Sequence, residues 1–349
     1  MDLYIKNREF ETVDIIDTAS SVIWREHGTS PGDFEIYIPV SEKSINALRY
    51  DYYVCRQDTD RVMIIKNIRI STDEEIGNFM IVTGPSLESI LHRRIIWTQT
   101  RWDGLVEMGI RQLIYENLYS PIDDARRISN FKFGTLQGFT EKMNVQFTGD
   151  NLGEVVTELC NTYGICYKIT LQDGYFVFDL FKGTDRSYNQ SENPYVVFSP
   201  QFENLQNSEY DFNSDNYKNV VLVAGEGEGL DRKTQAVGTA SGLDRYEMYT
   251  DARSMSTNNG EISDAVYFEQ LAEDGRLELQ ENTAVETFNG VVNYTTPYVY
   301  GIDYFLGDTV QVINEYGISG SPTIVETIEC EDENGYTLIP TFQYTGGIG

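Results

Sequence analysis

The first 95 residues contain short segments in which apolar and polar positions alternate, the period of a half-buried strand. In GDFEIYIP (residues 32–39), Phe34, Ile36 and Ile38 fall on one face of the predicted strand, and polar or tyrosine side chains fall on the other. Similar segments predict strands at 3–10, 13–25, 51–56, 61–70 and 78–82. Six short strands in so few residues predict a small antiparallel barrel or sandwich.

From about residue 96 the period of the apolar positions becomes helical. Apolar residues recur every three or four positions between 104 and 118, and Pro121 follows, which predicts a helix there. A second helix is predicted after Asn151, because Glu154 three positions later completes a capping-box pattern and Gly164 supplies a C-terminal stop. The segment 165–181 then predicts a hairpin around the turn QDG.

The last third of the chain returns to predicted strands. They fall at 219–224, 284–292, 308–314, 323–329 and 335–342. One helix is predicted at 263–281, although Gly275 should weaken it by roughly 1 kcal/mol relative to alanine. We therefore predict a mainly β protein with an α+β insertion: β modules at 1–95 and 196–349, an α+β unit at 96–195, and an excursion from the second module at about 226–282.

Composition strengthens the β prediction and restricts the possible partners. The 24 tyrosines suit the half-buried surface of a sheet. The net charge is −29, and 26 acidic against 6 basic residues from position 201 onward account for −20 of it. Such a surface would repel nucleic acid and anionic membranes, which bind basic footprints.

The cysteines and the apolar runs indicate a soluble protein made in the cytoplasm. Cys55, Cys160, Cys166 and Cys330 show no CxxC and no metal-ligand spacing, and a bridge between Cys160 and Cys166 is conceivable but not predictable. The N-terminal MDLYIKNREF lacks the features of a signal peptide. No apolar run approaches the length of a membrane span, so we expect no membrane anchor.

Only two histidines occur, which excludes most hydrolytic sites. His27 lies in a turn-rich segment and His92 in LHRRII, and neither has a second ligand or triad partner at suitable spacing. Zinc peptidases, cysteine amidases and Ser-His-Asp esterases all require such a histidine. A glycoside hydrolase needs only two carboxylates, but no pattern distinguishes a pair among the 55 acidic residues. The run ECEDEN (329–334) predicts a solvated hairpin tip, because it lacks the spacing of a calcium loop.

The stretch NVVLVAGEGEGLD (219–231) superficially resembles a dinucleotide-binding loop. Gly225, Gly227 and Gly229 follow an apolar strand, but their spacing is G-x-G-x-G, and no helix is predicted after them to hold a pyrophosphate. Glu226 and Glu228 also place negative charge where a phosphate would lie. The stretch therefore predicts a core strand of the second β module, a flexible acidic hairpin tip and a returning strand.

Several stretches together resemble the hub proteins at the tip of bacteriophage tails, from siphophages and prophage-derived tail particles. They span nearly the whole chain: 20–40 (SSVIWREHGTSPGDFEIYIPV), 61–96 with its S-L-x-x-I-L-x-R-R-I pattern, 219–232, 243–253 and 300–312. None is a catalytic motif, so the resemblance depends on their number and order. Many tail proteins continue into an endopeptidase or fibre region, whereas this sequence ends at Gly349, so no lytic activity is expected.

The resemblance implies a homotrimer in which each subunit supplies two tube-like antiparallel β-barrels, with the α+β domain outside or below the ring. Implied partners are the tail tube or distal tail protein, a spike or tip protein and a tape measure protein. The implied location is a virion tail or tail-like particle, with synthesis in the host cytoplasm. DNA would pass through the channel without specific binding, helped by carboxylates on its wall.

The leading prediction is therefore a structural hub with no enzymatic activity, no cofactor and no catalytic or metal-binding residue. The alternative is a cell-wall-directed glycoside hydrolase or glycan-binding tail protein with an acid pair in the α+β domain.

Overall fold

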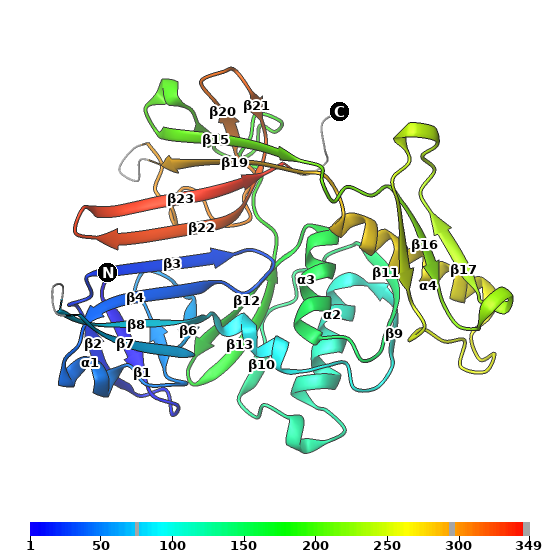
Figure 1. Cartoon of the computed structure of the whole chain (residues 1–349), viewed down its shortest axis with the longest axis horizontal. Coiled ribbons are helices and arrows are strands. Elements are labelled where there is room, and N and C mark those ends of the chain that lie inside the picture. The colour runs from blue at the N-terminus through cyan, green and yellow to red at the C-terminus, as the bar shows by residue number, and fades with distance from the viewer. Residues whose placement is uncertain (74–76, 293–296, 345–349) are drawn as a thin grey trace.

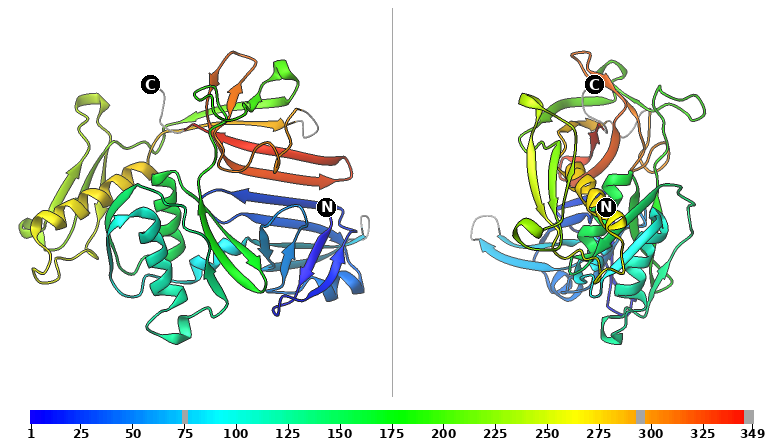
Figure 2. Two further views of the ribbon diagram at one scale, coloured as in Figure 1. Left: turned by 180° about the vertical axis from the view of Figure 1, so that it is seen from behind. Right: turned by 90° about the vertical axis from the view of Figure 1, so that its right-hand side faces the viewer.

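The structure, a computed structural model, describes residues 1–73, 77–292 and 297–344. Strands predominate over helices, and in the described residues they form six sheets. The largest sheet lies at one end of the molecule, helix α4 (Asp264–Glu281) lies at the other, and helices α2 (Val106–Ile114) and α3 (Leu152–Tyr163) lie between them (Figure 1). The view from behind in Figure 2 shows the same order. None of the described helices is long and apolar enough to cross a membrane.

The largest sheet contains eight strands drawn from both ends of the chain. In spatial order they are β15 (Leu205–Asn213), β19 (Val285–Val292), β23 (Gly335–Gln343), β22 (Thr323–Asp332), β3 (Ser21–His27), β4 (Asp33–Pro39), β8 (Gly77–Pro85) and β7 (Asn67–Asp73). The two halves meet where β22 pairs antiparallel with β3, with Glu326 opposite His27. Strands β15 and β7 are the two edges of the sheet.

Each half of this sheet packs against a smaller sheet. The N-terminal half covers β2 (Thr12–Ile16), β1 (Leu3–Lys6), β5 (Tyr53–Cys55) and β6 (Val62–Ile64), with Trp24 and Phe34 in the core between them. The short helix α1 (Glu42–Ala47), capped by Ser41, follows β4 and was not predicted. The C-terminal half covers β14 (Val197–Phe198), β20 (Gln311–Ile313) and β21 (Ser319–Gly320), with Phe198 and Phe342 in the core.

The middle of the chain forms a unit of helices and short sheets around its own core. Besides α2 and α3 it contains η1 (Leu87–Arg93), β9 (Thr100–Leu105), the π-helical turn η2 (Tyr115–Tyr119), η3 (Asp124–Arg126), β10 (Phe131–Phe133), β11 (Lys142–Phe147), β12 (Cys166–Gln172) and β13 (Tyr175–Phe181). The core also takes in Val62 and Ile64 from β6, so it continues into the N-terminal part of the chain.

The structure confirms the second predicted helix and the hairpin after it. The Asn151 side chain accepts hydrogen bonds from the backbone nitrogens of Gly153 and Glu154, at 2.9 and 3.2 Å, and Gly164 ends α3 with a φ of 60°. The first predicted helix is shorter than expected: its first two residues belong to β9, and α2 ends at Ile114 before the π-helical turn.

The excursion is a separate layer made of a small sheet and α4. Its strands are β16 (Val220–Ala224), β17 (Thr234–Val237) and β18 (Glu247–Asp251), connected by the turns η5 (Gly229–Asp231) and η6 (Gly242–Asp244). The expectation that 219–224 is a core strand of the second β module is therefore wrong, because β16 pairs with β17 and β18. The apolar run predicted the strand, but it contains no information about the partner strand.

Gly275 has a packing role that its helix propensity did not reveal. It lies where α4 crosses the small sheet, and a Cβ added there would lie 2.8 Å from Val237 Cγ2 and 2.9 Å from Val223 Cγ2. The glycine therefore allows the close approach of the helix to β16 and β17.

Several predicted strands differ from the structure. The segments 13–25 and 61–70 each divide into two strands, 3–10 is a strand only at β1, and 308–314 is a strand only at β20. The described strands form open sheets rather than a closed barrel, so the prediction of two tube-like barrels is not confirmed. The alternation of apolar and polar residues along a strand is the same in an open sheet and in a closed barrel, so the sequence could not distinguish the two. The domain boundaries near residues 95 and 195 stay predictions.

Candidate functional site

The eight-stranded sheet has one face covered by the two cores and one face that carries no other layer. Along β3, Val22, Trp24 and Glu26 point into the core, while Ile23 and Arg25 alternate to the opposite side. We call this second side the open face. Its side chains are mostly polar, and the register places on it Arg69, Thr83, Asp33, Glu35, Arg25, His27, Glu326, Thr337, Thr341, Thr287, Asn289, Glu209 and Asp211.

Arg25 organises the charges at the centre of the open face. Its Nη1 lies 2.6 Å from Asp33 Oδ1 and its Nε lies 3.2 Å from Glu326 Oε1, so it connects β4 with β22 across β3. His27 Nε2 lies 3.5 Å from the same Glu326 oxygen, and burial holds the pKa of His27 below its ordinary value. His27 is therefore a neighbour of an ion pair on the sheet.

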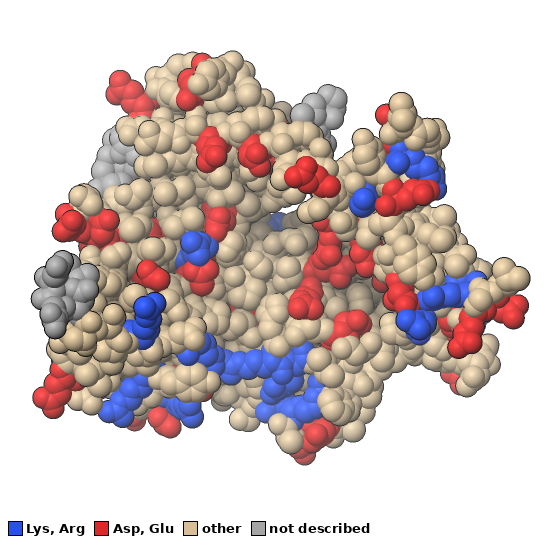
Figure 3. All heavy atoms as spheres, in the orientation of Figure 1, with Lys and Arg blue, Asp and Glu red and all other residues tan. Residues whose placement is uncertain are grey.

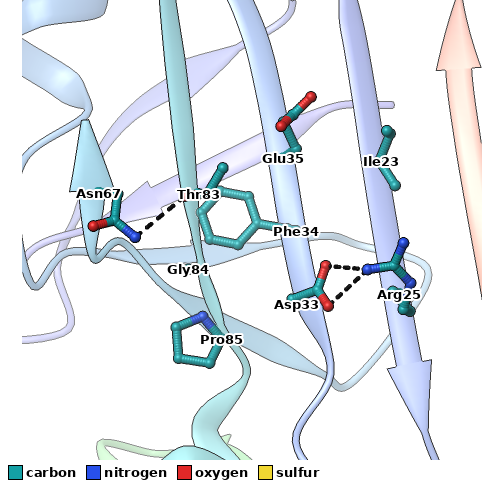
Figure 4. Close-up of a pocket in the computed structure, with 9 residues that line it drawn as sticks. All are labelled: Ile23, Arg25, Asp33, Phe34, Glu35, Asn67, Thr83, Gly84 and Pro85. Atoms are coloured by element: carbon teal, nitrogen blue, oxygen red, sulfur yellow. Dashed lines mark hydrogen bonds and ion pairs between the residues drawn. The ribbon is translucent and has the colours of Figure 1, made fainter. Parts of the chain in front are cut away.

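A depression of about 380 Å³ lies beside this ion pair on the open face (Figure 4). Arg25 and Asp33 point toward each other on one side, and Asn67 donates to the Thr83 hydroxyl at 3.4 Å on the other. Its remaining lining residues are Ile23, Phe34, Glu35, Gly84 and Pro85. The lining is shallow and polar, which is typical of a surface for contact and not of a site for chemistry.

A buried charge network lies directly behind the open face. Glu26 accepts hydrogen bonds from Trp24 Nε1 and Thr59 Oγ1, both at 2.9 Å, and lies 4.0 Å from Arg61. Arg61 also pairs with Glu88, whose Oε1 accepts the backbone N–H of Ile169 at 2.9 Å. Burial raises the pKa of Glu26. The positive charge of Arg61 opposes this rise without cancelling it.

The same network continues to the C-terminal strands. Arg56 donates to both carboxylate oxygens of Glu329, at 3.0 and 2.8 Å, and Glu329 is 5% exposed. Glu329 was predicted to lie in a solvated hairpin tip, and this is wrong, because β22 continues to Asp332 and Glu329 points inward. The network therefore joins β3, β12 and β22, and buried ion pairs of this kind hold parts of a protein in one arrangement.

The glycine-rich stretch after β16 is a hairpin that is tied down by its first glutamate. Glu226 accepts hydrogen bonds from the backbone N–H and the hydroxyl of Thr257, at 2.9 and 2.7 Å, and pairs with Lys233 at 2.9 Å. Burial alone would raise the pKa of Glu226, but these hydrogen bonds outweigh it and lower the pKa to about 2. The expected flexible acidic tip is therefore an anchored turn, although Gly227 and Gly229 do have positive φ, as predicted.

The remaining candidate residues are His92 and the cysteines. His92 lies against Gly153 at the start of α3, and a Cβ at that glycine would meet its ring at 2.4 Å. Cys160 and Cys166 are free thiols, and burial raises the pKa of Cys166 to about 11. Within residues 1–73, 77–292 and 297–344, no group of three or more His, Cys, Asp or Glu side chains could hold a metal ion.

Sequence analysis missed the features that make the open face a candidate site. The alternation in residues 32–39 correctly identified Phe34, Ile36 and Ile38 of β4 as the inward-pointing side chains, but it did not show that β3 pairs with a strand some 300 residues later. Arg25 meets Asp33 within the N-terminal half. The contacts of Arg25 with Glu326 and of Arg56 with Glu329, however, depend on the pairing of β22 with β3. The only local signal was the presence of charged residues inside apolar strands, such as Glu26 in SVIWREH.

Comparisons with known proteins place this fold among phage tail proteins. The family model described as "Siphovirus ReqiPepy6 Gp37-like protein" matches residues 2–342. The fold is similar to that of the tail protein from Neisseria meningitidis MC58, with 14% identity, a TM-score of 0.59, and coverage of 99% of this chain and 97% of that one. It is also similar to the 43 kDa tail protein of prophage MuSo2 from Shewanella oneidensis, with 10% identity, a TM-score of 0.59 and 98% coverage of both chains.

A third similar structure is the prophage tail protein gp18 from Listeria monocytogenes EGD-e. Its identity to this chain is 13%, the TM-score is 0.53, and the match covers 99% of this chain and 95% of that one. None of the curated proteins matches this sequence. At identities this low, the three structures show a shared fold and do not transfer the role of any residue.

Proposed function

The chain belongs to the Siphovirus ReqiPepy6 Gp37-like protein family, and we propose that it is a structural tail hub: a homotrimer that joins the tail tube to the tip or spike and lines the channel. The observation that carries the proposal is the eight-stranded sheet, which consists of two four-stranded halves, has one open face and ends in two unpaired edges.

The two halves supply the repeat that a trimer needs to match a six-fold tube. Strands β3, β4, β8 and β7 come from the N-terminal part, and β22, β23, β19 and β15 come from the C-terminal part. Each half has its own core. Three copies would therefore present six similar four-stranded units in a ring, each one corresponding to a tube-like barrel module of the hub.

The two edges of the sheet supply a way to close that ring. Strands β7 and β15 each have an unpaired side, and an unpaired strand is a template for pairing with another chain. Pairing β7 of one copy with β15 of the next is a heterologous contact, which generates a closed ring when the rotation between copies is right. Ile68 and Ile70 on β7, 39% and 52% exposed, would be buried by that contact.

The open face would then form the wall of the channel. Its charged side chains include the carboxylates Asp33, Glu35, Glu209, Asp211 and Glu326 against the cations Arg25 and Arg69. Two of these carboxylates are already paired with Arg25. The remaining excess of negative charge supports a wall that repels the phosphates of DNA in transit.

The proposed partners follow from this position in the tail. The tail tube or distal tail protein would contact one end of the ring, and a spike or tip protein the other, with a tape measure protein inside the channel before ejection. The α2–α3 unit and the α4 unit extend from one end of the sheet (Figure 1), and in the proposed ring they would lie outside the channel wall. Synthesis in the host cytoplasm is part of the same proposal.

The alternative, a cell-wall-directed glycoside hydrolase or glycan-binding tail protein, has one observation in its favour. Glu158 and Asp274 lie in neighbouring helices, and burial together with nearby carboxylates raises their pKa values to about 8 and about 7. A glycosidase, however, needs two carboxyl groups whose pKa values are pushed apart. Here burial also raises the pKa of Glu278 and Glu281, so the whole group shifts in one direction.

The trimer is tested by measuring the mass of the purified chain by sedimentation equilibrium and imaging any assembly by electron microscopy. We expect rings of three copies, and Ile70→Lys on β7 should disrupt them because a charge on an edge strand opposes pairing. Ile45→Lys is the matched control, since Ile45 is similarly exposed (45%) but lies on helix α1 and not on an edge strand. Rings unaffected by Ile70→Lys would contradict the edge contact.

A peptidoglycan assay separates the hub from its alternative. We expect no solubilisation of cell-wall material by the purified chain. Solubilisation that is abolished by Glu158→Gln and retained by Glu154→Gln, its exposed neighbour one turn earlier on α3, would favour the enzyme.

A further inference from the structure

The excursion is attached to the rest of the protein by two short linkers that lie side by side. The first, residues 214–219, connects β15 to β16, and the second, residues 282–284, connects α4 to β19. The backbone N–H of Lys218 donates to the carbonyl of Asn282 at 2.8 Å, which joins the two linkers at one point. Hinges consist of a few loop residues or residues at the ends of elements. The attachment therefore permits the excursion to rotate about the paired linkers.

The excursion has its own core and only a small apolar contact with the α2–α3 unit. Tyr267 and Leu271 of α4 form this core together with Val221 and Val223 of β16. Among the described residues of the excursion, Leu277 alone belongs to the core of the α2–α3 unit. Parts of one chain are expected to move relative to each other unless their interface is large and hydrophobic. The apolar contact by itself therefore does not fix the position of the excursion.

Uncharged hydrogen bonds add to the contact between the excursion and the α2–α3 unit. The Gln146 side chain accepts from the backbone N–H of Ser256 at 2.7 Å and donates to the carbonyl of the same residue at 3.3 Å. Asn258 donates to the side chain of Gln99 at 2.9 Å. Amide groups do not titrate near neutral pH. The holding effect of these hydrogen bonds is therefore the same in weak acid and in weak base.

An acid cluster lies where α3 meets α4. The two helices are in contact, and acidic residues from both, together with one from the loop before α3, influence one another's ionisation. The members of the cluster are Asp150, Glu154, Glu158, Asp274, Glu278 and Glu281. Figure 3 shows acidic side chains gathered over this region. Part of the contact that holds the excursion in place therefore consists of groups of like charge.

The two helices supply no cation to the acid cluster. Helix α3 contains no basic residue, and Arg276, the single basic residue of α4, pairs with Glu269 and Glu273 instead. Among the described residues, no ion pair involves a member of the cluster. Asp274 Oδ2 is buried and has no hydrogen-bond partner in the described part of the chain. When the cluster is ionised, its members therefore repel one another across the contact between α3 and α4.

Groups on other elements do not compensate the acid cluster either. His92 on η1 is close enough to interact with Glu154, but burial lowers the pKa of its imidazole, so His92 is uncharged at neutral pH. Thr250 on β18 forms a hydrogen bond with Glu278, which favours the ionised form of that carboxyl but supplies no positive charge. The repulsion across the helix contact is therefore not cancelled from η1 or β18.

The acid cluster binds protons while the excursion is docked. Burial, reinforced by the neighbouring carboxylates, raises the pKa of Glu158 from 4.5 to about 8 and that of Asp274 from 3.8 to about 7. Burial and a neighbouring carboxylate also raise the pKa values of Asp150, Glu278 and Glu281. In an undocked excursion water would reach these side chains, and their pKa values would return toward the ordinary ones. A rise in pH from about 4 to about 8 therefore favours undocking, because the docked state binds more protons in this range.

We propose that the excursion is a hinged arm, which stays docked on α3 while the acid cluster holds protons and swings away when the cluster ionises. The paired linkers are the hinge, and the like-charge contact between α3 and α4 is the switch. The inference concerns contacts within one copy, so it does not depend on the trimer or on the role in the tail. A carboxyl whose pKa is one unit higher in the docked state changes the docking equilibrium about tenfold once the pH exceeds both values.

Small-angle X-ray scattering from the chain as it elutes from a sizing column tests the arm, because one measurement gives both the mass and the radius of gyration. We expect the radius of gyration to increase reversibly between about pH 5.5 and about pH 9, at constant mass, as the ratio of docked to undocked molecules falls about tenfold or more. Circular dichroism at both pH values verifies that the secondary structure is retained.

Variants assign the change to the acid cluster. Glu158→Gln with Asp274→Asn removes two of the charges and should keep the arm docked at about pH 9. Glu281→Lys, at an exposed position, introduces a cation into the cluster and should have the same effect without altering a buried side chain. Asp2→Asn with Glu42→Gln is the matched control: it removes the same charge at exposed positions near the N-terminus and should open like the wild type.

Two results would overturn the proposal. One is a wild type whose radius of gyration is the same at both pH values. The other is an opening at about pH 9 that persists in Glu281→Lys and in the neutralised variant, because another group would then control the arm. If the neutralised variant does not fold, Glu281→Lys decides between these outcomes, since its substituted side chain is exposed.

Discussion

Arg56 binds Glu329 across the seam between the N-terminal and C-terminal halves of the protein, with both carboxylate oxygens accepting hydrogen bonds from one guanidinium. The two side chains are 2% and 7% exposed. Arg56 also lies 5.2 Å from the centre of the Trp24 ring, and the Tyr336 hydroxyl donates to Glu329 at 2.6 Å. The seam therefore contains a buried ion pair whose two members each make a further contact, Arg56 with Trp24 and Glu329 with Tyr336.

Removal of one member of this pair should destabilise the protein strongly. Glu329→Ala leaves the buried Arg56 with only the exposed Asp58 as counter-charge, and we expect the free energy of unfolding to fall by about 3 kcal/mol. Chemical denaturation measures the change. Asp58→Asn is the control: Asp58 also pairs with Arg56 but is 65% exposed, so about 1 kcal/mol or less is expected. Equal losses in the two variants would contradict the importance of the buried pair.

Gly275→Ala should destabilise the protein even though alanine favours helix. The gain in helix propensity is about 1 kcal/mol. The added methyl group would approach branched valine side chains that cannot move away easily, and overpacking of this kind costs about 1–3 kcal/mol. We expect a net loss, measured by thermal or chemical unfolding. A more stable variant would show that α4 can shift away from β16 and β17 without cost.

Glu226 should stabilise the excursion at neutral pH and lose that effect in acid. Its pKa in the folded protein is about 2, below its ordinary value of 4.5, so between these values the unfolded chain binds more protons. The stabilisation that the Glu226 charge supplies is complete above pH 4.5 and disappears as the pH falls toward 2. We expect Glu226→Gln to cost about 1–2 kcal/mol at pH 7 and much less near pH 2.5.

The measurement for Glu226 is chemical denaturation of wild type and variant at both pH values. Glu228→Gln, in the same turn but exposed, is the matched control and should change little. If Glu226→Gln lowers the free energy of unfolding equally at both pH values, the introduced amide group, and not the loss of the carboxylate charge, is responsible.

Glu158 should have the opposite pH dependence. Burial, with Glu281, Asp274, Glu278 and Asp150 nearby, raises its pKa from 4.5 to about 8, so the folded state binds more protons than the unfolded state between these values. The stability of the isolated chain should therefore fall as the pH rises from 4.5 to 8. Because Glu158 is partly exposed, we expect Glu158→Gln to raise the free energy of unfolding at pH 8 by only about 1 kcal/mol.

For Glu158, chemical denaturation at pH 5 and pH 8 measures the difference between wild type and variant. The variant should be more stable than wild type at pH 8 and similar to it at pH 5. The reverse order would mean that Glu158 has a cationic neighbour that compensates its charge in the folded protein.

Local features of the fold could be predicted because their causes are local. Asn151 and Gly164 bound α3 by interactions within one helical turn, and the alternation in β3 and β4 reflects one covered face. Ser263 likewise begins α4, where its side chain accepts the N–H of Val266. These patterns identified the mainly β class, most elements and, through their order along the chain, the family.

The candidate site could be predicted only in part, because its residues meet through pairings distant in sequence. Neither Arg25 nor Glu326 has a sequence neighbour that marks it as a partner of the other.

The sequence by itself determined the period of the elements that it predicted, the caps of α3 and α4 and the charge balance of the chain. Tertiary structure alone decided that β22 pairs with β3, that β16 belongs with α4, that Glu329 is buried and that Gly275 is a contact point. The physical reason is that backbone hydrogen bonds between strands and the burial of charge depend on which segments meet, and that choice is made by the free energy of the whole chain.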